Sequence, residues 1–170
     1  QGKTNLIIGE SGSGKTVLIK CMVGLFEVDK GQILYDGRDF TTMSFKNRKE
    51  IRKEIGMLFQ GGALFDSQTL EENVRFPLDM FTKMSKGEKN DRVQFSLERV
   101  KLEGKNNLYP AELSGGMKKR AALLRTFLVS SDILLLDEPF GALDAITKSE
   151  LQDFLLEICE KYKHTVLFIT

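Results

Sequence analysis

A glycine-rich segment near the beginning of the chain carries the clearest chemistry of the sequence. Residues 9–16 read GESGSGKT, which matches the pattern GxxxxGK followed by Ser or Thr, and they fall between a predicted strand and a predicted helix. Such glycines let backbone N–H groups turn inward around a phosphate, and the helix N-terminus adds partial positive charge. Lys15 is then placed to reach the β- and γ-phosphates, and the hydroxyl of Thr16 to bind Mg²⁺. A tight turn at a packed helix start is the alternative, but a chance match has odds of roughly one in a hundred, so we predict a nucleotide site.

A second segment supplies acidic groups. Residues 133–138 read ILLLDE, which predicts a buried aliphatic strand that ends in two carboxylates. Open parallel sheets bind their ligands at the C-terminal edge of the strands. We therefore expect Asp137 to hold Mg²⁺ through water, and Glu138 to orient or deprotonate the attacking water. Alone, such a segment is usually a core strand that runs into a polar loop. Together with the phosphate loop, it favours hydrolysis over transfer to a bound acceptor.

A third segment offers a second place for an anion. Residues 113–117 read LSGGM and open a predicted helix, so that Ser114, Gly115 and Gly116 form an anion nest at its N-terminus. One chain is not expected to aim both nests at one nucleotide, and a head-to-tail dimer would bring them together. The cations at residues 118–120 (KKR) oppose the helix dipole by about 0.3–1 kcal/mol each when exposed. A nearby anion would offset this cost, and a solvated basic face is an equally good interpretation.

The elements that must position these residues alternate between strands and helices. A two-residue turn, Asp36-Gly37, lies between residues 32–35 and 38–41 and is typical of a hairpin. Residues 61–115 show no strand pattern and contain helical pieces near 69–74 and 91–101. The sequence predicts an α/β fold, in which a parallel sheet with flanking helices carries an inserted helical subdomain and a partial antiparallel β hairpin. The strands are expected at 4–8, 56–59, 133–137 and 165–169, and the other helices at 15–25, 45–55, 117–129 and 147–162.

Composition limits the class of protein. The chain has 170 residues, of which 41% are apolar, with 25 basic and 24 acidic side chains. This length suits one domain, and the charge balance gives no global attraction to nucleic acid or to an anionic membrane. No apolar run is long enough to span a membrane. Cys21 and Cys159 are far apart, and His164 is the single histidine, so that a disulfide framework and a Cys/His metal site are not expected. We expect the cysteines to be buried small hydrophobes and His164 to be a surface or packing residue.

With these motifs in order, the sequence resembles the ATP-binding cassette (ABC) ATPases, whose signature reads LSGGQ. Gln60 at the end of a strand corresponds to the Q-loop, and residues 141–144 (GALD) correspond to the D-loop. The spacings are also those of the family: 45 residues from Lys15 to Gln60, 54 from Gln60 to Ser114, and 23 from Ser114 to Asp137. The resemblance covers nearly the whole chain.

The resemblance implies a P-loop NTPase fold, with ATP and Mg²⁺ as cofactors and ATP hydrolysis as the activity. It implies one ABC ATPase domain over residues 1–170, with a RecA-like core at 1–60 and 116–170 and a helical subdomain at about 61–115. The implied catalytic residues are Glu138, Lys15 and Gln60, and the implied metal ligands are Thr16, Gln60 and Asp137. The implied nucleotide-binding residues are Gly9, Ser11, Gly12, Ser13, Gly14, Lys15, Thr16, Val17, Ser114, Gly115, Gly116 and Asp144.

The resemblance also implies partners. Two ATPase subunits would form a homodimer, with each ATP between the phosphate loop of one subunit and the signature of the other. The dimer would bind integral membrane permease subunits, which would be its only association with the membrane, at the cytoplasmic face of the inner membrane. A nucleic-acid partner is not expected. Gln60 would begin the segment that receives the permease, and the apolar residues at 61–65 (GGALF) suit a docking groove.

Two stretches resemble a narrower group, the ATPases of MCE-linked phospholipid transporters of the Mla/toluene-tolerance type. They are residues 56–67 and 114–120, and Met117 in place of the signature glutamine is typical of that group. Residues 137–144 (DEPFGALD) read more like ATPases of small-solute importers. We favour phospholipid transport, with an importer of amino acids or osmoprotectants as the alternative.

Other classes fit less well. Chromosome- or repair-associated ABC ATPases carry hundreds of coiled-coil residues between the phosphate loop and the signature, whereas translation-associated ones carry two cassettes. A nucleotide-binding module without turnover is disfavoured for the parent protein by Lys15, Asp137 and Glu138, and it stays an alternative for these 170 residues, which lack the switch histidine of the family. In the family, an adenine-stacking aromatic precedes the phosphate loop, and a switch histidine follows the strand that ends this sequence. We therefore expect residues 1–170 to be the middle of a longer cassette, truncated at both ends. We expect this stretch to be poorly soluble or weakly active alone.

Overall fold

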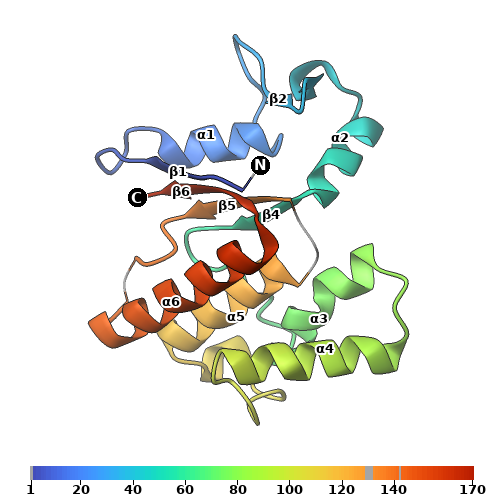
Figure 1. The fold of residues 1–170 in the computed structure, drawn as a ribbon, viewed down its shortest axis with the longest axis vertical. Helices are drawn as coiled ribbons and strands as arrows, with labels where there is room; N and C mark the ends of the chain where they lie inside the picture. The colour runs from blue at the N-terminus through green and yellow to red at the C-terminus, as the bar shows by residue number, and fades with distance from the viewer. Residues whose placement is uncertain (1, 129–131, 142) are drawn as a thin grey trace.

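The computed structural model describes residues 2–128, 132–141 and 143–170, without the side chains at positions 161 and 162. A four-stranded parallel sheet with the strand order β1-β6-β5-β4 crosses the middle of the molecule (Figure 1). All the strands end at one edge, because each pairs with its neighbour in the same direction. The strands are β1 (Thr4–Ile7), β4 (Ile55–Leu58), β5 (Ile133–Asp137) and β6 (Thr165–Ile169).

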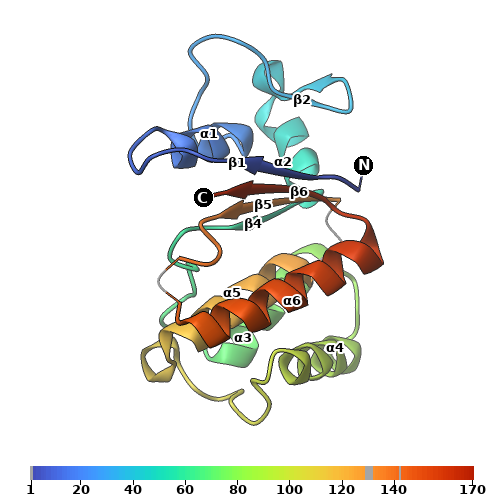
Figure 2. The ribbon, with the colours of Figure 1, turned by 60° about the vertical axis from the view of Figure 1, so that its left-hand side comes forward.

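Helices cover both faces of the sheet, which confirms the predicted α/β fold. Helix α1 (Lys15–Met22) lies on one face, and α5 (Gly115–Phe127) and α6 (Ala145–Tyr162) lie on the other (Figure 2). Successive residues of a strand point to opposite faces. Accordingly, Leu135 packs with Ile19 of α1, while the neighbouring Leu134 and Leu136 pack with Leu123 of α5. Helix α1 ends before the predicted residue 25, and Val129, the last residue of the predicted helix 117–129, lies outside the described residues.

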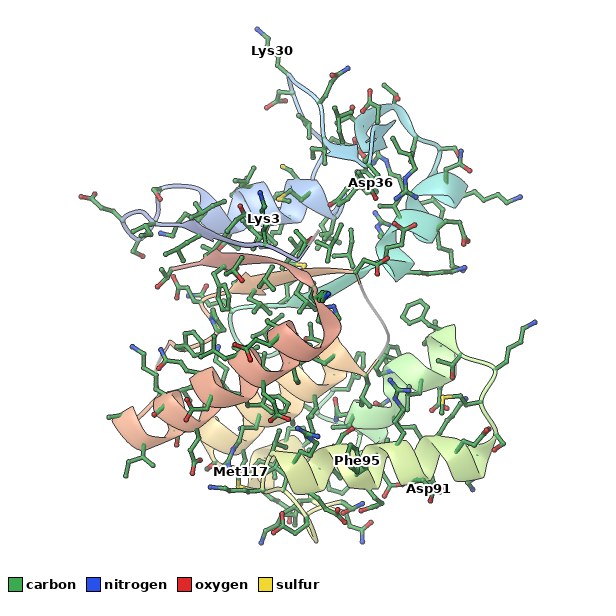
Figure 3. The ribbon with its side chains drawn as sticks, viewed as in Figure 1. Lys3, Lys30, Asp36, Asp91, Phe95 and Met117 are labelled. Atoms are coloured by element: carbon green, nitrogen blue, oxygen red, sulfur yellow. The ribbon has the colours of Figure 1, made fainter. Side chains whose placement is uncertain are left out.

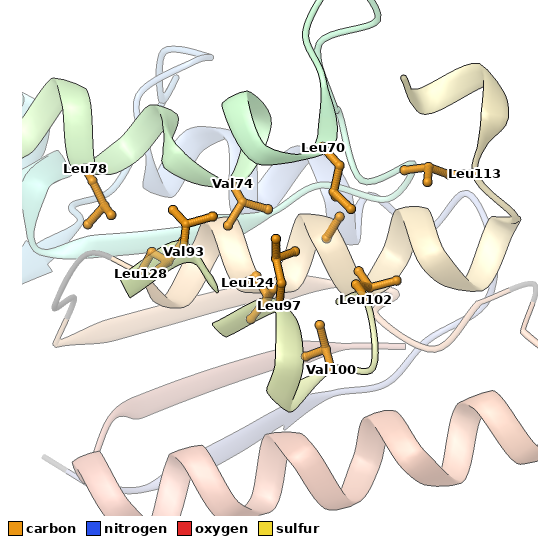
Figure 4. Packing of buried hydrophobic residues seen from close by; sticks show 11 residues of the cluster. Leu70, Val74, Leu78, Val93, Leu97, Val100, Leu102, Leu113, Leu124 and Leu128 are labelled. Atoms are coloured by element: carbon orange, nitrogen blue, oxygen red, sulfur yellow. The ribbon is translucent and has the colours of Figure 1, made fainter. Parts of the chain in front are cut away.

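A further layer of helices packs against α5. It contains α3 (Leu70–Phe81), α4 (Lys86–Arg99) and the short 3₁₀ helix η2 (Pro110–Glu112). Helix α5 is apolar on two sides, because Ala121 and Leu124 join the cluster of this layer and Leu123 joins the cluster of the sheet. Figure 4 shows the cluster of the helical layer, which contains Leu70, Val74, Leu78, Val93, Leu97, Val100, Leu102, Leu113, Ala121, Leu124 and Leu128.

Helices α3 and α4 are longer than the predicted pieces. Thr69 and Ser85 begin them with capping boxes, each completed by the glutamate three residues later. The first turns of α4 are polar and gave no hydrophobic period, so the sequence placed its start five residues late. On the outside of α4, Arg99 lies 5.6 Å from the ring centroid of the exposed Phe95 (Figure 3) and forms an ion pair with Glu157 of α6. The division into a core and a helical subdomain at about 61–115 stays a prediction.

The predicted hairpin forms, but its strands are short. Strands β2 (Leu34–Tyr35) and β3 (Arg38–Asp39) are antiparallel, and Asp36 and Gly37 between them have φ values of 48° and 77°. This left-handed pair closes the tight turn that the sequence predicts. The carboxylate of Asp39 then accepts a hydrogen bond from the N–H of Thr41, which begins η1 (Phe40–Thr42) and ends the strand. Helix α2 (Phe45–Lys53) follows and leads into β4.

Within the described part of the chain, no helix combines the length and the apolar character that crossing a membrane requires. Cys21 and Cys159 are partly rather than fully buried, which corrects the expectation for both, and burial raises the pKa of the Cys159 thiol. His164 is partly buried, with its ring centroid 6.3 Å from that of Phe127, in agreement with a packing role.

Candidate nucleotide-binding site

The glycine-rich segment forms an exposed loop between β1 and α1. Gly14 caps the N-terminus of α1 with φ 91°, and Gly12 has φ 83°. A Cβ atom at either position would meet no neighbour within 4 Å, so the left-handed backbone, rather than lack of space, requires glycine there. The loop thus presents backbone N–H groups at the start of a helix, as a phosphate site needs.

The side chain of Lys15 lies over this loop. Its Nζ atom donates hydrogen bonds to the carbonyl oxygens of Gly9, at 2.5 Å, and Glu10, at 2.7 Å. Both acceptors belong to the loop itself, so the ammonium group is held where a phosphate on the loop would meet it. Ser11 and Ser13 are exposed in the same loop, and Val17 is exposed in the first turn of α1.

Thr16 and Asp137 meet across the start of α1 and the end of β5. The Thr16 hydroxyl donates a hydrogen bond of 3.2 Å to Oδ1 of Asp137. Asp137 is 1% exposed, and its Oδ2 has no hydrogen-bond partner. A buried carboxylate oxygen without a partner is costly, and a bound cation removes that cost. The pair of oxygen ligands and the orphaned atom therefore fit Mg²⁺, which prefers carboxylate and hydroxyl oxygens.

Gln60 and Glu138 meet at the same edge of the sheet. Strands β4 and β5 are neighbours, so Gln60, two residues past β4, faces Glu138, one residue past β5. Gln60 Nε2 donates a 2.8 Å hydrogen bond to Glu138 Oε2. Glu138 has φ 46°, a conformation that costs free energy for a residue with a side chain. Its N–H donates to the carbonyl of Ile169 at 3.0 Å, which ties it to the end of β6.

The segment that the sequence predicts to be the second nest lies at the start of α5, whose position Met117 marks in Figure 3. Ser114 caps the helix by accepting from the N–H of Met117 at 3.3 Å. A Cβ atom on Gly116 would lie 3.0 Å from Thr147 Cγ2, so α5 approaches the first turn of α6 closely. Asp144 caps α6 by accepting from the N–H of Thr147 at 2.9 Å, and these hydrogen bonds lower the pKa of its carboxyl group.

The structure therefore divides the predicted site residues into two groups. Lys15 lies on the phosphate loop, and Thr16, Gln60, Asp137 and Glu138 gather beside it at the C-terminal edge of the sheet. Gly115 and its neighbours at the start of α5 form the second group with Asp144. In the part of the chain that the structure describes, no hydrogen bond joins the second group to residues 9–16. Ala142 of the GALD segment lies outside the described residues.

Two of the three basic residues at 118–120 donate hydrogen bonds within the chain. Lys119 donates from Nζ to the carbonyl oxygen of Glu138 at 3.1 Å, and burial lowers the pKa of its ammonium group. Arg120 donates to the carbonyl of Val100 at 3.1 Å. These two cations are therefore engaged in contacts within the chain. The reason is that the first turns of α5 lie between the sheet edge and the helical layer. Both interpretations of the sequence stay predictions for Lys118, which is partly exposed.

Sequence reasoning missed the residues that hold the loop after Gln60. Asn73 is fully buried in α3, accepts a hydrogen bond from the N–H of Phe65 at 2.7 Å and donates to the carbonyl of Phe65 at 3.0 Å. Arg125 of α5 donates to the carbonyl of Ala63 at 2.7 Å. A polar residue inside an apolar helical stripe, as Asn73 is, is the signal that could have been found in the sequence.

Comparisons with known proteins agree with this geometry. The profile of the family described as "ABC transporter" matches residues 1–141. The solved ATP-binding cassette MJ0796, a dimer in a post-hydrolysis state bound to ADP and Pi, aligns with a TM-score of 0.91 and 31% identity, over 99% of this chain and 75% of that one. The probable ribonucleotide transport ATP-binding protein mkl of Mycobacterium leprae is 40% identical over 99% of this chain and 49% of its own length.

Two further relatives carry different names. The trimethylamine N-oxide transport ATP-binding protein TmoW of Pelagibacter ubique is 40% identical over all of this chain and 50% of its own length. The sulfate/thiosulfate import ATP-binding protein CysA of Synechocystis is 40% identical over 99% of this chain and 46% of its own length. The chain thus spans about half the length of the curated relatives it matches.

The parallel sheet and its phosphate loop define a P-loop NTPase. The chain belongs to the ABC transporter family, and its domain is an ATP-binding cassette of the ATPase type, whose cofactors are ATP and Mg²⁺.

Proposed function

We propose that this chain is the ATP-hydrolysing part of a subunit that energises a membrane transporter. The observation that carries the proposal is the meeting of Thr16, Gln60, Asp137 and Glu138 beside the phosphate loop. In this proposal the backbone N–H groups of residues 9–17 and the ammonium of Lys15 bind the phosphates. When bound, Mg²⁺ neutralises charge on the transferred phosphoryl group.

The residues of the chain then have separate tasks. Lys15 exchanges the carbonyls of Gly9 and Glu10 for phosphate oxygens. Thr16 and Asp137 hold the metal, with Gln60 as a further ligand. Glu138 accepts the proton of the attacking water. The hydrogen bond to Oε2 fixes the direction of this carboxylate and leaves Oε1 to take the proton.

The second group of residues acts in a homodimer in this proposal. Ser114, Gly115 and Gly116 form the N-terminus of α5, which suits an anion. This helix lies on the other side of the sheet from the phosphate loop of its own chain (Figure 2). A head-to-tail arrangement of two chains would place this nest, and Asp144 beside it, on the nucleotide of the partner. The dimeric state of the related cassette MJ0796 supports this arrangement.

The dimer would bind the permease through the loop after Gln60, at the cytoplasmic face of the inner membrane. Phe65 in this loop is 40% exposed, and Met80 and Phe81 at the end of α3 are also exposed. Apolar side chains on such a surface suit contact with another protein. Asn73 and Arg125 hold the loop in place from beneath.

For the transported substrate we propose a phospholipid, on the resemblance of residues 56–67 and 114–120 to the lipid-transport ATPases. The alternative is a small solute. Relatives named for trimethylamine N-oxide, sulfate/thiosulfate and glycine betaine/carnitine favour it, with identities of 39–40%. The cassette acts on ATP in either case, and the permease decides the substrate.

Two measurements test the proposal. The intact protein should hydrolyse ATP in the presence of Mg²⁺, and Lys15→Ala should abolish the reaction, whereas Lys105→Ala, at an exposed position far along the chain, should not. Purification of the native complex, followed by mass spectrometry of its membrane subunit and extracted lipids, tests the substrate. A phospholipid retained in stoichiometric amount supports the first candidate, and a solute-importer permease without lipid supports the second.

A further inference from the structure

Lys119 makes a contact that none of the roles above requires. It lies on α5, five residues after Ser114, yet its Nζ atom reaches the loop that follows β5 and donates to the carbonyl oxygen of Glu138 at 3.1 Å. An ammonium group that is partly buried needs such an acceptor. The acceptor that it finds belongs to the proposed base.

The backbone of Glu138 needs support from its surroundings. Its φ of 46° is left-handed, and a residue with a side chain keeps this conformation only where neighbours fix it. Three hydrogen bonds do so: its N–H donates to the carbonyl of Ile169 at 3.0 Å, and its carbonyl accepts from the N–H of Gly141 at 3.1 Å and from Lys119. The first two join backbone groups. The third comes from a side chain on another element.

We propose that Lys119 is a positioning residue for Glu138, and that it links the signature helix α5 to the loop after β5 in the same chain. The inference rests on the proposed role of Glu138 as the base. The carbonyl that Lys119 holds belongs to the same residue as the reacting carboxylate, so Lys119 supports the left-handed backbone that carries this side chain. Loss of the ammonium would let this backbone relax toward a more favourable φ, which would move the carboxylate from its place beside the water.

The contact between Lys119 and Glu138 also connects the two nucleotide sites of the proposed dimer. Lys119 follows Ser114 by about 7.5 Å along the helix axis at 1.5 Å per residue. In a head-to-tail dimer, Ser114 would contact the nucleotide of the partner, while Lys119 acts on the base of its own chain. A shift of α5 on engaging one nucleotide would therefore reach the other site through Lys119. The close approach of Gly116 to Thr147 restricts how else α5 can move.

The test compares variants of Lys119 in the intact protein by steady-state ATP hydrolysis. Lys119→Met keeps the length of the side chain without the charge, and Lys119→Arg keeps a cationic donor. Lys105→Met is the matched control, because Lys105 is an exposed lysine in the loop after α4. We expect Lys119→Met to lower kcat about ten-fold or more, the effect of losing a charged hydrogen bond. KM for ATP should change less than about two-fold, because Lys119 contacts no nucleotide in the proposal.

Lys119→Arg should keep most of the activity. Because Lys119 would couple the two nucleotide sites, Lys119→Met should also bring the Hill coefficient for ATP close to one. An unchanged kcat in Lys119→Met would overturn the proposal, and so would a raised KM with an unchanged kcat. If Lys119→Met unfolds at the assay temperature, Lys119→Arg and Lys119→Leu, which has no donor, are compared instead, and equal activities would overturn the proposal. Wild-type protein without Mg²⁺-dependent hydrolysis would contradict the proposed function itself, which is a different outcome.

Discussion

Gln60 and Glu138 are 78 residues apart in the sequence, and they are joined by a 2.8 Å hydrogen bond from Nε2 to Oε2. The bond links the ends of two neighbouring strands, β4 and β5, at the edge that carries the phosphate loop. It orients the carboxylate that we propose as the base. An amide at position 60 can donate to this carboxylate, whereas an ionised glutamate at the same position could not.

Substitution of Gln60 tests this bond. Gln60→Ala removes the donor, and Gln60→Glu places a second carboxylate against Oε2 of Glu138. Like charges at hydrogen-bond distance repel strongly. We expect both variants to lower kcat, and Gln60→Glu to lower it more, by roughly ten-fold beyond Gln60→Ala. Equal activity of Gln60→Glu and wild type would show that the two side chains separate during turnover.

The orphaned oxygen of Asp137 predicts an effect on stability without any ligand. Its Oδ2 is buried and without a hydrogen-bond partner. Asp137→Asn removes the buried charge, so we expect the metal-free protein to become more stable, by about 1–3 kcal/mol. We expect wild type to gain thermal stability with Mg²⁺ and ATP, and the variant to lose this gain. Thr16→Ala is the counterpart: it removes the donor to Oδ1 and should destabilise the metal-free protein.

Calorimetry with and without Mg²⁺ and ATP measures both effects. A metal-free Asp137→Asn protein that is less stable than wild type would contradict the assignment of Oδ2 as an uncompensated group.

Two adjacent glycines after Gln60 form a matched pair. Gly62 has φ 82°, and a Cβ atom there would lie 3.2 Å from Cβ of Ala122, whereas a Cβ on Gly61 meets nothing within 4 Å. We expect Gly62→Ala to lower the free energy of unfolding by about 1–3 kcal/mol through strain and crowding. Gly61→Ala should change it by less than about 0.5 kcal/mol. Urea unfolding of both variants checks this, and a reversed order would be inconsistent with the loop geometry.

Tyr35 in strand β2 of the hairpin carries a phenol that titrates at high pH. Tyr35 is 5% exposed, its hydroxyl donates to the carbonyl of Met22 at 2.8 Å, and burial raises its pKa to about 12. The same phenol ionises near pH 10 in the unfolded chain. Because the pKa of the phenol is higher in the folded state, its contribution to the free energy of unfolding is fully present below about pH 10. It falls as the pH rises from about 10 to 12, by roughly 1.4 kcal/mol per pH unit.

Tyr35→Phe cannot ionise, so it isolates this effect. At neutral pH the variant should be less stable than wild type by about 1 kcal/mol, for the lost hydrogen bond. The difference should shrink above pH 10 and then change sign. Denaturant unfolding at pH 8 and pH 11 measures it. A constant difference across that range would mean that the phenol is not buried.

Much of the site could be predicted because parallel strands end at one edge. Asp137 ends an aliphatic strand and Glu138 directly follows it, and Lys15 and Thr16 follow a glycine-rich loop after another strand. The pairing of Thr16 with Asp137 follows once both strands belong to one sheet. The contact between Gln60 and Glu138 is different, because it requires β4 to lie beside β5, and strand order is not written in local patterns.

The remaining errors have physical causes. The polar first turns of α4 hide its start, which the capping box of Ser85 and Glu88 sets. The side chain of Asp39 caps η1 and shortens the hairpin strand, a local competition that alternation of side chains does not reveal. The partner of Lys119 is a carbonyl oxygen brought near by the packing of α5, and a backbone group carries no sequence signature.

The central claim is that Glu138 is the base of an ATPase that works as a head-to-tail dimer. The most direct measurement combines the ATPase rate and the molecular mass of Glu138→Gln in the intact protein with Mg²⁺ and ATP. The variant keeps an amide at the position of the carboxylate, so it should bind ATP, remain a dimer in light scattering, and lose nearly all turnover. Hydrolysis at the wild-type rate, or a monomer with ATP bound, would contradict the account.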